Sequence, residues 1–365
     1  MSQQNHVREP LVRIARRSSI YWTKAWAIRA LAIIAALVVD AMIIYFITKL
    51  NPLKVYVTMF EGTFGSNRRI WMTLREMAML LCIGVGLAPA FKMRFWNVGA
   101  EGQVLVGGIA TAACMIYLKN LPTAAMMAIM FVASAAAGAV WGLLPAVFKS
   151  RWDTNETLFT LMMNYVALQL TAFMVTKWEN PFGSNSVGVI NQNTQSGWFP
   201  RVLGQQYLMN VIIVLVLTLV MYAYLKYSKQ GYEIAVVGES RNTARYAGID
   251  VKHVIVRTML LSGAVCGIAG MVGVAGADHT ISVNTAGGRG FTAIIVAWMA
   301  KFNTLVMMLI TALLIFLDRG AAEIASIYNL NEYASEMISG VILFFLLGCE
   351  FFINYRLIFR HKEGK

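Results

Sequence analysis

Charged residues are scarce in this sequence. Only 13% of the 365 residues are charged, whereas 58% are hydrophobic and the mean hydropathy is +0.61. Soluble domains carry about 25% charged residues, so the composition excludes an ordinary soluble enzyme or binding module. We therefore expect lipid to surround most of the protein surface.

Residues that form disulfides or bind metals are few and widely spaced. The four cysteines, at positions 82, 114, 266 and 349, lie inside apolar runs, which is typical of small packing residues and not of a disulfide framework or a zinc site. The four histidines are equally scattered, and no two of them lie four residues apart. The sequence predicts no metal site.

A nucleotide-binding loop is also missing. The phosphate loop of ATPases has the pattern G-x-x-x-x-G-K-[ST], but the pair Lys149 and Ser150 follows Phe148 where that pattern requires glycine. The chain therefore has no P-loop route to ATP hydrolysis. We expect it to be a transport subunit and not an enzyme, with no cofactor of its own.

What the chain has instead is a series of long apolar runs. A spanning helix needs about 20 mostly apolar residues, and the sequence predicts an all-α polytopic membrane protein, one domain over residues 1–365. Ten helices are expected, near residues 28–48, 73–90, 98–118, 123–147, 155–176, 207–226, 254–275, 290–300, 304–317 and 335–353. The segment 290–300 would rise only about 16 Å, so a broken or re-entrant helix is expected within 287–300.

The net charge of +13 is explained by membrane topology and does not indicate nucleic-acid binding. The basic residues cluster at the two ends of the chain and in short loops, as expected for segments on the cytosolic side of a membrane. A basic lead, 1–27, and a basic tail, 354–365, are both expected in the cytosol of a bacterial inner membrane, which requires an even number of crossings. The first apolar run has no small-residue cleavage site behind it, so we interpret it as a retained helix. The basic residues Lys49, Lys54, Arg68 and Arg69 oppose this orientation.

Two polar stretches are too long for simple turns. The first, 178–206, is rich in Asn, Gln, Gly and Ser; it is expected outside, as a cap on which another protein docks. The second, 227–253, is expected in the cytosol, and within it glycines bracket a short helix, Glu239 to Ala247, with Ser240 as its cap. Such a helix can transmit the motion of a cytosolic partner to the spans beside it; the alternative is an ordered loop without that role. The residues of this coupling segment are Gly238, Glu239, Ser240, Arg241, Ala244, Arg245 and Gly248.

Four stretches carry a resemblance to a known family. They are FWNVGAEGQVLVGG (95–108), NETLFTLMMNYVA (155–167), GYEIAVVGESRNTARYAGI (231–249) and GRGFTAIIVAWMA (288–300). Together they resemble the blocks of ABC importer permeases of the ribose, branched-chain amino acid and nucleoside group, over most of residues 75–350. The NVGAEGQ form, the long lead and the polar outer loop are most similar to the longer permease of nucleoside (guanosine-type) importers.

The resemblance implies a type II-like importer permease within a larger complex. The partners would be a second, shorter permease, a cytosolic ATPase that binds ATP and Mg²⁺, and a lipid-anchored extracytoplasmic binding protein. Membrane lipid would surround the chain itself. The cargo would be a nucleoside, with purine nucleosides favoured.

Polar residues inside the apolar runs are the candidates for the substrate pathway. Glu101, beside Asn97 and Gln103, is costly at the entry to an apolar helix unless it faces a cavity or a partner. It either binds ribose hydroxyls or braces the fold, for which Arg94 is a candidate partner. Asn164 either contacts substrate or bonds to a neighbouring helix. Phe291 and Thr292 follow the glycine-rich turn 287–290 and are expected to face the pathway, near Asn97 and Glu101.

Glycines recur on single faces of two of the expected helices. Gly263, Gly267 and Gly270 share one helix face, as do Gly138 and Gly142, so close helix packing is expected there.

The same fold would also suit an importer of ribose or another small sugar. An ion-coupled secondary transporter is a third possibility, although the intramembrane acids form no spaced series.

Overall fold

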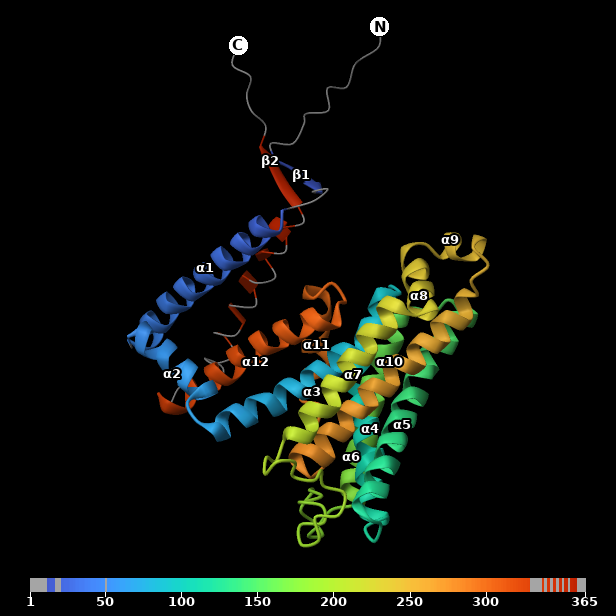
Figure 1. Ribbon diagram of the computed structural model, residues 1–365. Coiled ribbons are helices and arrows are strands. Elements are labelled where there is room, and N and C mark those ends of the chain that lie inside the picture. Colours follow the sequence, from blue (N-terminus) through green and yellow to red (C-terminus); the bar gives the residue numbers. More distant parts are fainter. Residues whose placement is uncertain are drawn as a thin grey trace, which may run out of the picture. The chain divides into compact units, whose positions relative to one another are not determined.

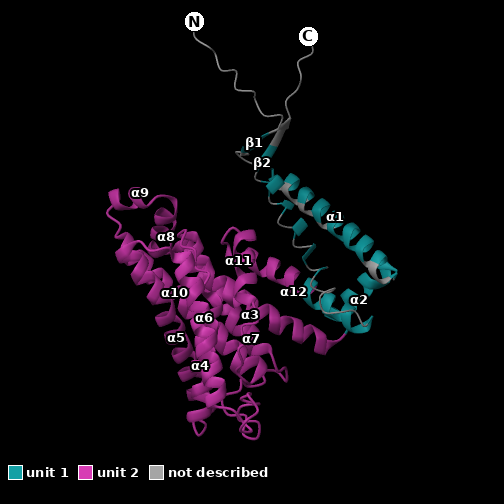
Figure 2. Cartoon of the chain, turned by 180° about the vertical axis from the view of Figure 1, so that it is seen from behind, with its two compact units in different colours: residues 1–65, 317–365 teal, residues 66–316 magenta. Residues whose placement is uncertain are grey.

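The computed structural model describes residues 12–16, 21–49, 51–328 and 355–359, together with 337, 340–341, 344–345, 348–349 and 351–353. These residues form two compact units, one of residues 1–65 and 317–365 and the other of residues 66–316, coloured separately in Figure 2. Each unit is described by itself.

The larger unit, 66–316, is a bundle of helices. It contains α3 (Asn67–Lys92), α4 (Ala100–Tyr117), α5 (Thr123–Trp152), α6 (Glu156–Lys177), α7 (Leu208–Tyr227), α8 (Lys229–Glu239), α9 (Arg241–Tyr246), α10 (Val251–Gly273), the π-helical turn η1 (Val274–Asp278), α11 (Arg289–Met299) and the first part of α12 (Thr304–Ile327). Side chains cap several of these helices: Asn155 accepts from the first amides of α6, and Asp250 from those of α10.

The centre of this bundle is α10, packed against α3, α4 and α5. In the most apolar stretch of α10 and η1, 83% of the residues are buried, whereas only 22% are buried in the corresponding stretch of α5. Helix α5 therefore lies at the periphery of the bundle. Glycines permit the close contact, because a Cβ on Gly138 or Gly263 would collide with the backbone of the other, and one on Gly270 with the carbonyl of Val104. The predicted packing role of these glycines is confirmed.

The polar segments occupy opposite ends of the larger unit (Figure 1). At one end lie α8 and α9, and the ends of α3 and α5 meet them there, since Gly238 packs on the carbonyl of Lys92 and Arg241 pairs with Asp153. At the other end, the loop 178–207 folds back onto the bundle. Its Val187, Ile190 and Phe199 are buried in a cluster with residues of α4, α5 and α10.

The smaller unit contains β1 (Val12–Arg16), α1 (Trp22–Thr48), α2 (Pro52–Phe64), the end of α12 and β2 (Tyr355–Phe359). Asn51 caps α2, and the hydroxyl of Tyr56 donates to the carbonyl of Leu37 in α1. The strands β1 and β2 pair antiparallel, with Ile14 opposite Leu357. The all-α prediction missed this ribbon, because its two strands are short and lie at opposite ends of the sequence.

The predicted count of ten spanning helices is not confirmed. Seven helices among the described residues are long and apolar enough to cross a membrane: α3, α4, α5, α6, α7, α10 with η1, and α12. The apolar stretch of α1 and the 11-residue α11 are shorter candidates. The predicted segment 335–353 is only partly covered by the described residues. Helices α2 and α8 were not predicted, since both are short and their apolar residues do not form long runs.

Candidate functional site

Glu101 joins two segments far apart in the sequence. It lies in the first turn of α4 and is 6% exposed. One carboxylate oxygen accepts a hydrogen bond from the amide of Gly288 at 2.7 Å, and the other accepts from the amide of Gly290 at 2.8 Å. Hydrogen bonds from amides to a carboxylate are strong, and these amides belong to the start of α11, where a negative charge also offsets the helix dipole. Glu101 therefore anchors α11 to α4.

The glycines at the start of α11 are required by this contact. A Cβ on Gly290 would lie 2.6 Å from the amide nitrogen of Glu101 and 2.7 Å from its Oε2, which is too close for any side chain. Gly288 has a φ of +73°, in the left-handed region that favours glycine. The motif GRG thus lets the backbone approach the carboxylate.

Asn97 and Gln103 form a buried network beside Glu101. The two amides bond to each other, each at 3.3 Å, and Asn97 also donates to the hydroxyl of Ser262 in α10 at 3.2 Å. The side-chain oxygen Oδ1 of Asn97 also accepts from the backbone amide of Gly99, just before α4 begins. Since Asn97 is fully buried and Gln103 is 1% exposed, this network fixes α4 against α10.

Asn164 extends this arrangement to α6. Its side chain accepts from the amide of Gly102 and donates to the carbonyl of Val98, both at 2.9 Å. Thr160, one turn earlier, accepts from the amide of Val98 at 3.2 Å. The Asn164 bonds satisfy the carbonyl of Val98, in the irregular segment before α4, and the amide of Gly102, in the first turn of α4. This is the interhelical role that was one of the two expectations for Asn164.

Phe291 and Thr292 directly follow Gly290, whose amide is bound by Glu101. Phe291 is 44% exposed, and Trp298, seven residues later in α11, is 45% exposed. Residues seven apart lie on one face of a helix, so α11 presents an aromatic face outward while Ala293, Val296 and Ala297 are buried. Thr292 is half-buried.

The structure therefore brings the predicted pathway residues together. Asn97, Glu101, Gln103 and Asn164 are all buried around the start of α4, where Asn97 and Gln103 bond to each other and Glu101 and Asn164 bond to the backbone. Phe291 is adjacent to Gly290, whose amide Glu101 binds. Arg94 is not the partner of Glu101, which bonds to α11 instead. Sequence reasoning missed Ser262 and Thr160, although a small polar residue inside an apolar run is a usable signal.

The coupling segment consists of two helices. Ser240 ends α8 and caps α9, where its hydroxyl accepts from the amide of Thr243. Gly238 is buried against the carbonyl of Lys92, where no side chain fits. Ala244 is fully buried and fixes α9 to the bundle. Glu239, Arg245 and Gly248 are exposed, and Tyr246 is 94% exposed.

Ion pairs connect this segment to the bundle. Lys149, near the end of α5, lies 2.8 Å from Asp153 and 2.9 Å from Glu156 in α6. Asp153 also faces Arg241 of α9 at 3.5 Å. The hydrogen bond and charge of Lys149 lower the pKa of the Asp153 carboxyl, which therefore stays ionised at neutral pH. Arg241 thus connects α9 with the α5–α6 turn.

Within the part of the chain that the structure describes, no group of three or more His, Cys, Asp or Glu residues could hold a metal ion. The site consists of amide, hydroxyl and carboxylate groups beside an aromatic helix face. Its chemistry is binding and positioning.

Comparison with known proteins gives a consistent result. The family model described as "Branched-chain amino acid transport system / permease component" matches residues 69–347. The guanosine ABC transporter permease protein NupP of Bacillus subtilis is 27% identical over 321 residues, which is 87% of this chain and 91% of NupP. No solved structure matches the chain significantly.

Two further relatives differ in cargo. The glucose ABC transporter permease protein TsgB13 of Haloferax volcanii is 25% identical over 353 residues, 94% of this chain and 92% of TsgB13. The nucleoside ABC transporter permease protein NupB of Lactococcus lactis is 25% identical over 306 residues, 81% of this chain and 84% of NupB.

Proposed function

The chain belongs to the family of branched-chain amino acid transport system permease components, and from this we propose that it forms the membrane pathway of an ATP-driven importer for nucleosides. It is a multi-pass membrane permease of the ABC class. The observation that carries the cargo assignment is the match, over most of both chains, to relatives named for guanosine and for nucleosides. Purine nucleosides are the favoured cargo.

Energy would come from a cytosolic ATPase that binds ATP and Mg²⁺, since this chain has no phosphate-binding loop. The ATPase would grip α9, whose exposed Arg245 and Tyr246 project from the bundle while Ala244 anchors it. Family membership in a permease class favours this arrangement over an ion-coupled secondary transporter.

Two other partners complete the complex that we propose. A second, shorter permease would form the other half of the pathway, because a permease "component" implies a system of several subunits. A lipid-anchored binding protein would dock on the loop 178–206, which is ordered by its buried residues and is held to the bundle by hydrogen bonds such as Ile190 to His279. The inner membrane would hold the complex with both termini of this chain in the cytosol.

The pathway would run beside the polar network that joins α4, α6, α10 and α11. Asn97, Glu101, Gln103 and Asn164 would set the position of α11, while Phe291 and Thr292 would face the passing solute. The burial of Glu101 and its two bonds to backbone amides at the start of α11 support a positioning role in preference to direct binding of ribose hydroxyls.

A sugar importer is the second candidate, because the glucose permease TsgB13 aligns over 94% of the chain. The assembled importer should therefore be tested for uptake of labelled guanosine, adenosine, uridine, ribose and glucose in vesicles. We expect ATP-dependent uptake of nucleosides, with ribose and glucose failing to compete. Uptake of glucose or ribose without nucleosides would refute the cargo assignment, and uptake without an ATPase would refute the class of machine.

A further inference from the structure

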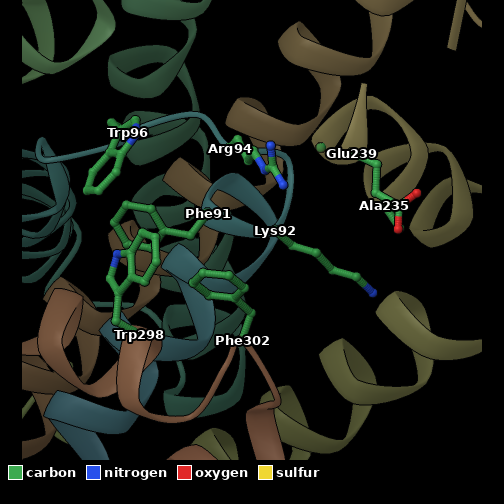
Figure 3. Close-up of a pocket in the computed structure, with 9 residues that line it drawn as sticks. Phe91, Lys92, Arg94, Trp96, Ala235, Glu239, Trp298 and Phe302 are labelled. Carbon is green, nitrogen blue, oxygen red and sulfur yellow. The ribbon is translucent and has the colours of Figure 1, made fainter. Parts of the chain in front are cut away.

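A cavity of about 530 Å³ opens at the end of the larger unit where α3, α8 and α11 meet (Figure 3). It lies next to the coupling segment, so it is on the side that we assign to the cytosol. Its lining divides into two kinds of residue. Four aromatic rings lie together, and charged side chains lie apart from them across the cavity.

The aromatic side is built around Phe91, which is 2% exposed. Its ring centroid lies 6.2 Å from those of Trp96, Trp298 and Phe302. Trp96 and Trp298 stack on each other at 5.1 Å with an interplanar angle of 25°. Because each of these two indoles is nearly half exposed, the stack offers an open aromatic face to a flat ligand.

The charged side carries complementary groups. Arg94 and Glu239 both line the cavity and are exposed, and neither makes an ion pair with a described residue that would neutralise it. A guanidinium donates to paired acceptors such as O6 and N7 of guanine, whereas a carboxylate accepts from ring and amino N–H groups. Lys92 is already engaged, since its ammonium donates to the carbonyl of Leu225 at 3.0 Å.

One helix face links the cavity lining to the residues proposed for the pathway. Phe291, beside the turn that Glu101 anchors, lies two helical turns before Trp298 on the same exposed face of α11. The aromatic face therefore leads from the polar network to the cavity.

From these observations we infer that the cavity is a cytosolic-side binding site for the base of the transported nucleoside. This inference rests on the proposed nucleoside cargo. The base stacks on Trp298 and Trp96, and Arg94 and Glu239 bind the hydrogen-bonding edge of a purine. Base–aromatic stacking stabilises binding independently of the sugar, so the site distinguishes a nucleoside from free ribose or glucose.

The test uses the assembled importer in inside-out vesicles and a membrane-impermeant maleimide. Ala235→Cys places a thiol on the cavity wall, and Val236→Cys places one on the same helix at a half-buried position that does not line the cavity. Vesicles with the unaltered chain give the background of the native cysteines. Saturating guanosine should abolish most labelling of Ala235→Cys and leave Val236→Cys unchanged, and ribose and glucose should protect neither.

A second substitution tests the stacking. Trp298→Leu keeps an apolar side chain but removes the ring face, so it should raise the guanosine concentration for half-protection by about tenfold or more, given the strength of base stacking. Trp152→Leu is the matched control, because Trp152 is an exposed indole at the same end of the unit but does not line the cavity. It should leave the half-protection concentration unchanged.

Three results would overturn the inference while leaving the nucleoside cargo intact. Guanosine uptake without protection of Ala235→Cys would place the site elsewhere. Equal protection by ribose would mean that the base is not read. A Trp298→Leu chain with a lower melting temperature but unchanged half-protection would make Trp298 a membrane-interface anchor. Uptake of glucose without guanosine would instead refute the proposed function itself.

Discussion

At the scale of single residues, Glu101 shows how an ionisable group is accommodated inside an apolar bundle. Its charge is met by two backbone amides and a helix N-terminus and not by a basic side chain. This arrangement fixes the start of α11, the helix that carries Phe291 and Trp298. In the importer that we propose, the residue would thus act on the pathway through α11.

Glu101→Gln should lower thermal stability and transport together. The glutamine amide can accept one hydrogen bond through its oxygen, but its NH₂ group faces the other amide donor, and bonds to a charged acceptor are worth about 1.5–3 kcal/mol. Melting temperature and nucleoside uptake should be measured on the same preparations. Loss of uptake at unchanged stability would support direct substrate binding by Glu101, and normal values of both would contradict both roles.

Gly290→Ala should have a similar effect from the other side of the contact. The added methyl group collides with the Glu101 backbone and carboxylate, and overpacking of this kind costs about 1–3 kcal/mol. Gly84→Ala is the control, because its Cβ would meet only ordinary contacts, the nearest being Val296 Cγ1 at 3.6 Å. If both alanine variants melt at the same temperature, the tight contact at Gly290 does not matter.

His279 provides a pH-dependent contribution to stability on the opposite side of the bundle. Its ring stacks on Trp198 at 3.8 Å, and burial lowers its pKa below the ordinary 6.5. As pH falls below about 6.5, the unfolded chain binds a proton that the folded chain does not, so the free energy of unfolding falls. The contribution is fully present above the unfolded pKa and is lost at acid pH.

Denaturation at pH 7 and pH 5 should show this loss. His279→Phe keeps a stacking ring without titration, so stability should depend less on pH in this variant than in the unaltered chain. The exposed His253 serves as the control, and His253→Gln should retain the full pH dependence. An unchanged slope in His279→Phe would show that another group is responsible.

The sequence predicted which polar residues matter better than it predicted the groups they contact. Asn97, Glu101 and Asn164 could be predicted because a polar group inside an apolar run must have a partner. The partner of Glu101 could not, since Gly288 and Gly290 are nearly two hundred residues away and offer only backbone amides. The charge-pairing rule pointed to Arg94, which lines the cytosolic-side cavity instead.

At the scale of helices, local signals determined what could be predicted. Ser240 as a cap and the glycine after α9 gave a coupling helix close to the observed Arg241–Tyr246. The longer α8 before it was missed, because its buried face depends on contact with α3 and α10 and not on a long apolar run. The chain therefore turns at Ser240, between α8, which packs on the bundle, and α9, which is mostly exposed.

Arg245→Ala should weaken assembly with the ATPase or uncouple ATP hydrolysis from uptake, without lowering the stability of the permease. The reason is that Arg245 is exposed on α9, whereas Arg241 is held by Asp153. Lys252→Ala, an exposed cation at the start of α10, is the control and should assemble normally. Copurification of the ATPase and the ratio of ATP hydrolysed to solute imported would be measured. Equal behaviour of the two variants would exclude α9 as the docking helix.

At the scale of the whole molecule, the positions of the polar segments relate the two ends of the larger unit to the two sides of the membrane. The segment 178–207 and the helices α8 and α9 lie at opposite ends of the larger unit (Figure 1). They are separated in sequence by α7, a single helix long enough to cross the membrane. If α9 meets a cytosolic ATPase, the loop must face the outside, where a binding protein can deliver the solute.

This orientation can be tested with two introduced thiols. Ser184→Cys lies in the loop before α7 and Asn242→Cys lies in α9, and both positions are exposed. Since accessibility is similar, labelling by an impermeant maleimide depends on the side of the membrane. Spheroplasts should label only Ser184→Cys, and inside-out vesicles only Asn242→Cys. Labelling of both from one side would mean that α7 does not cross, and the reverse pattern would place α9 outside, where no ATPase could reach it.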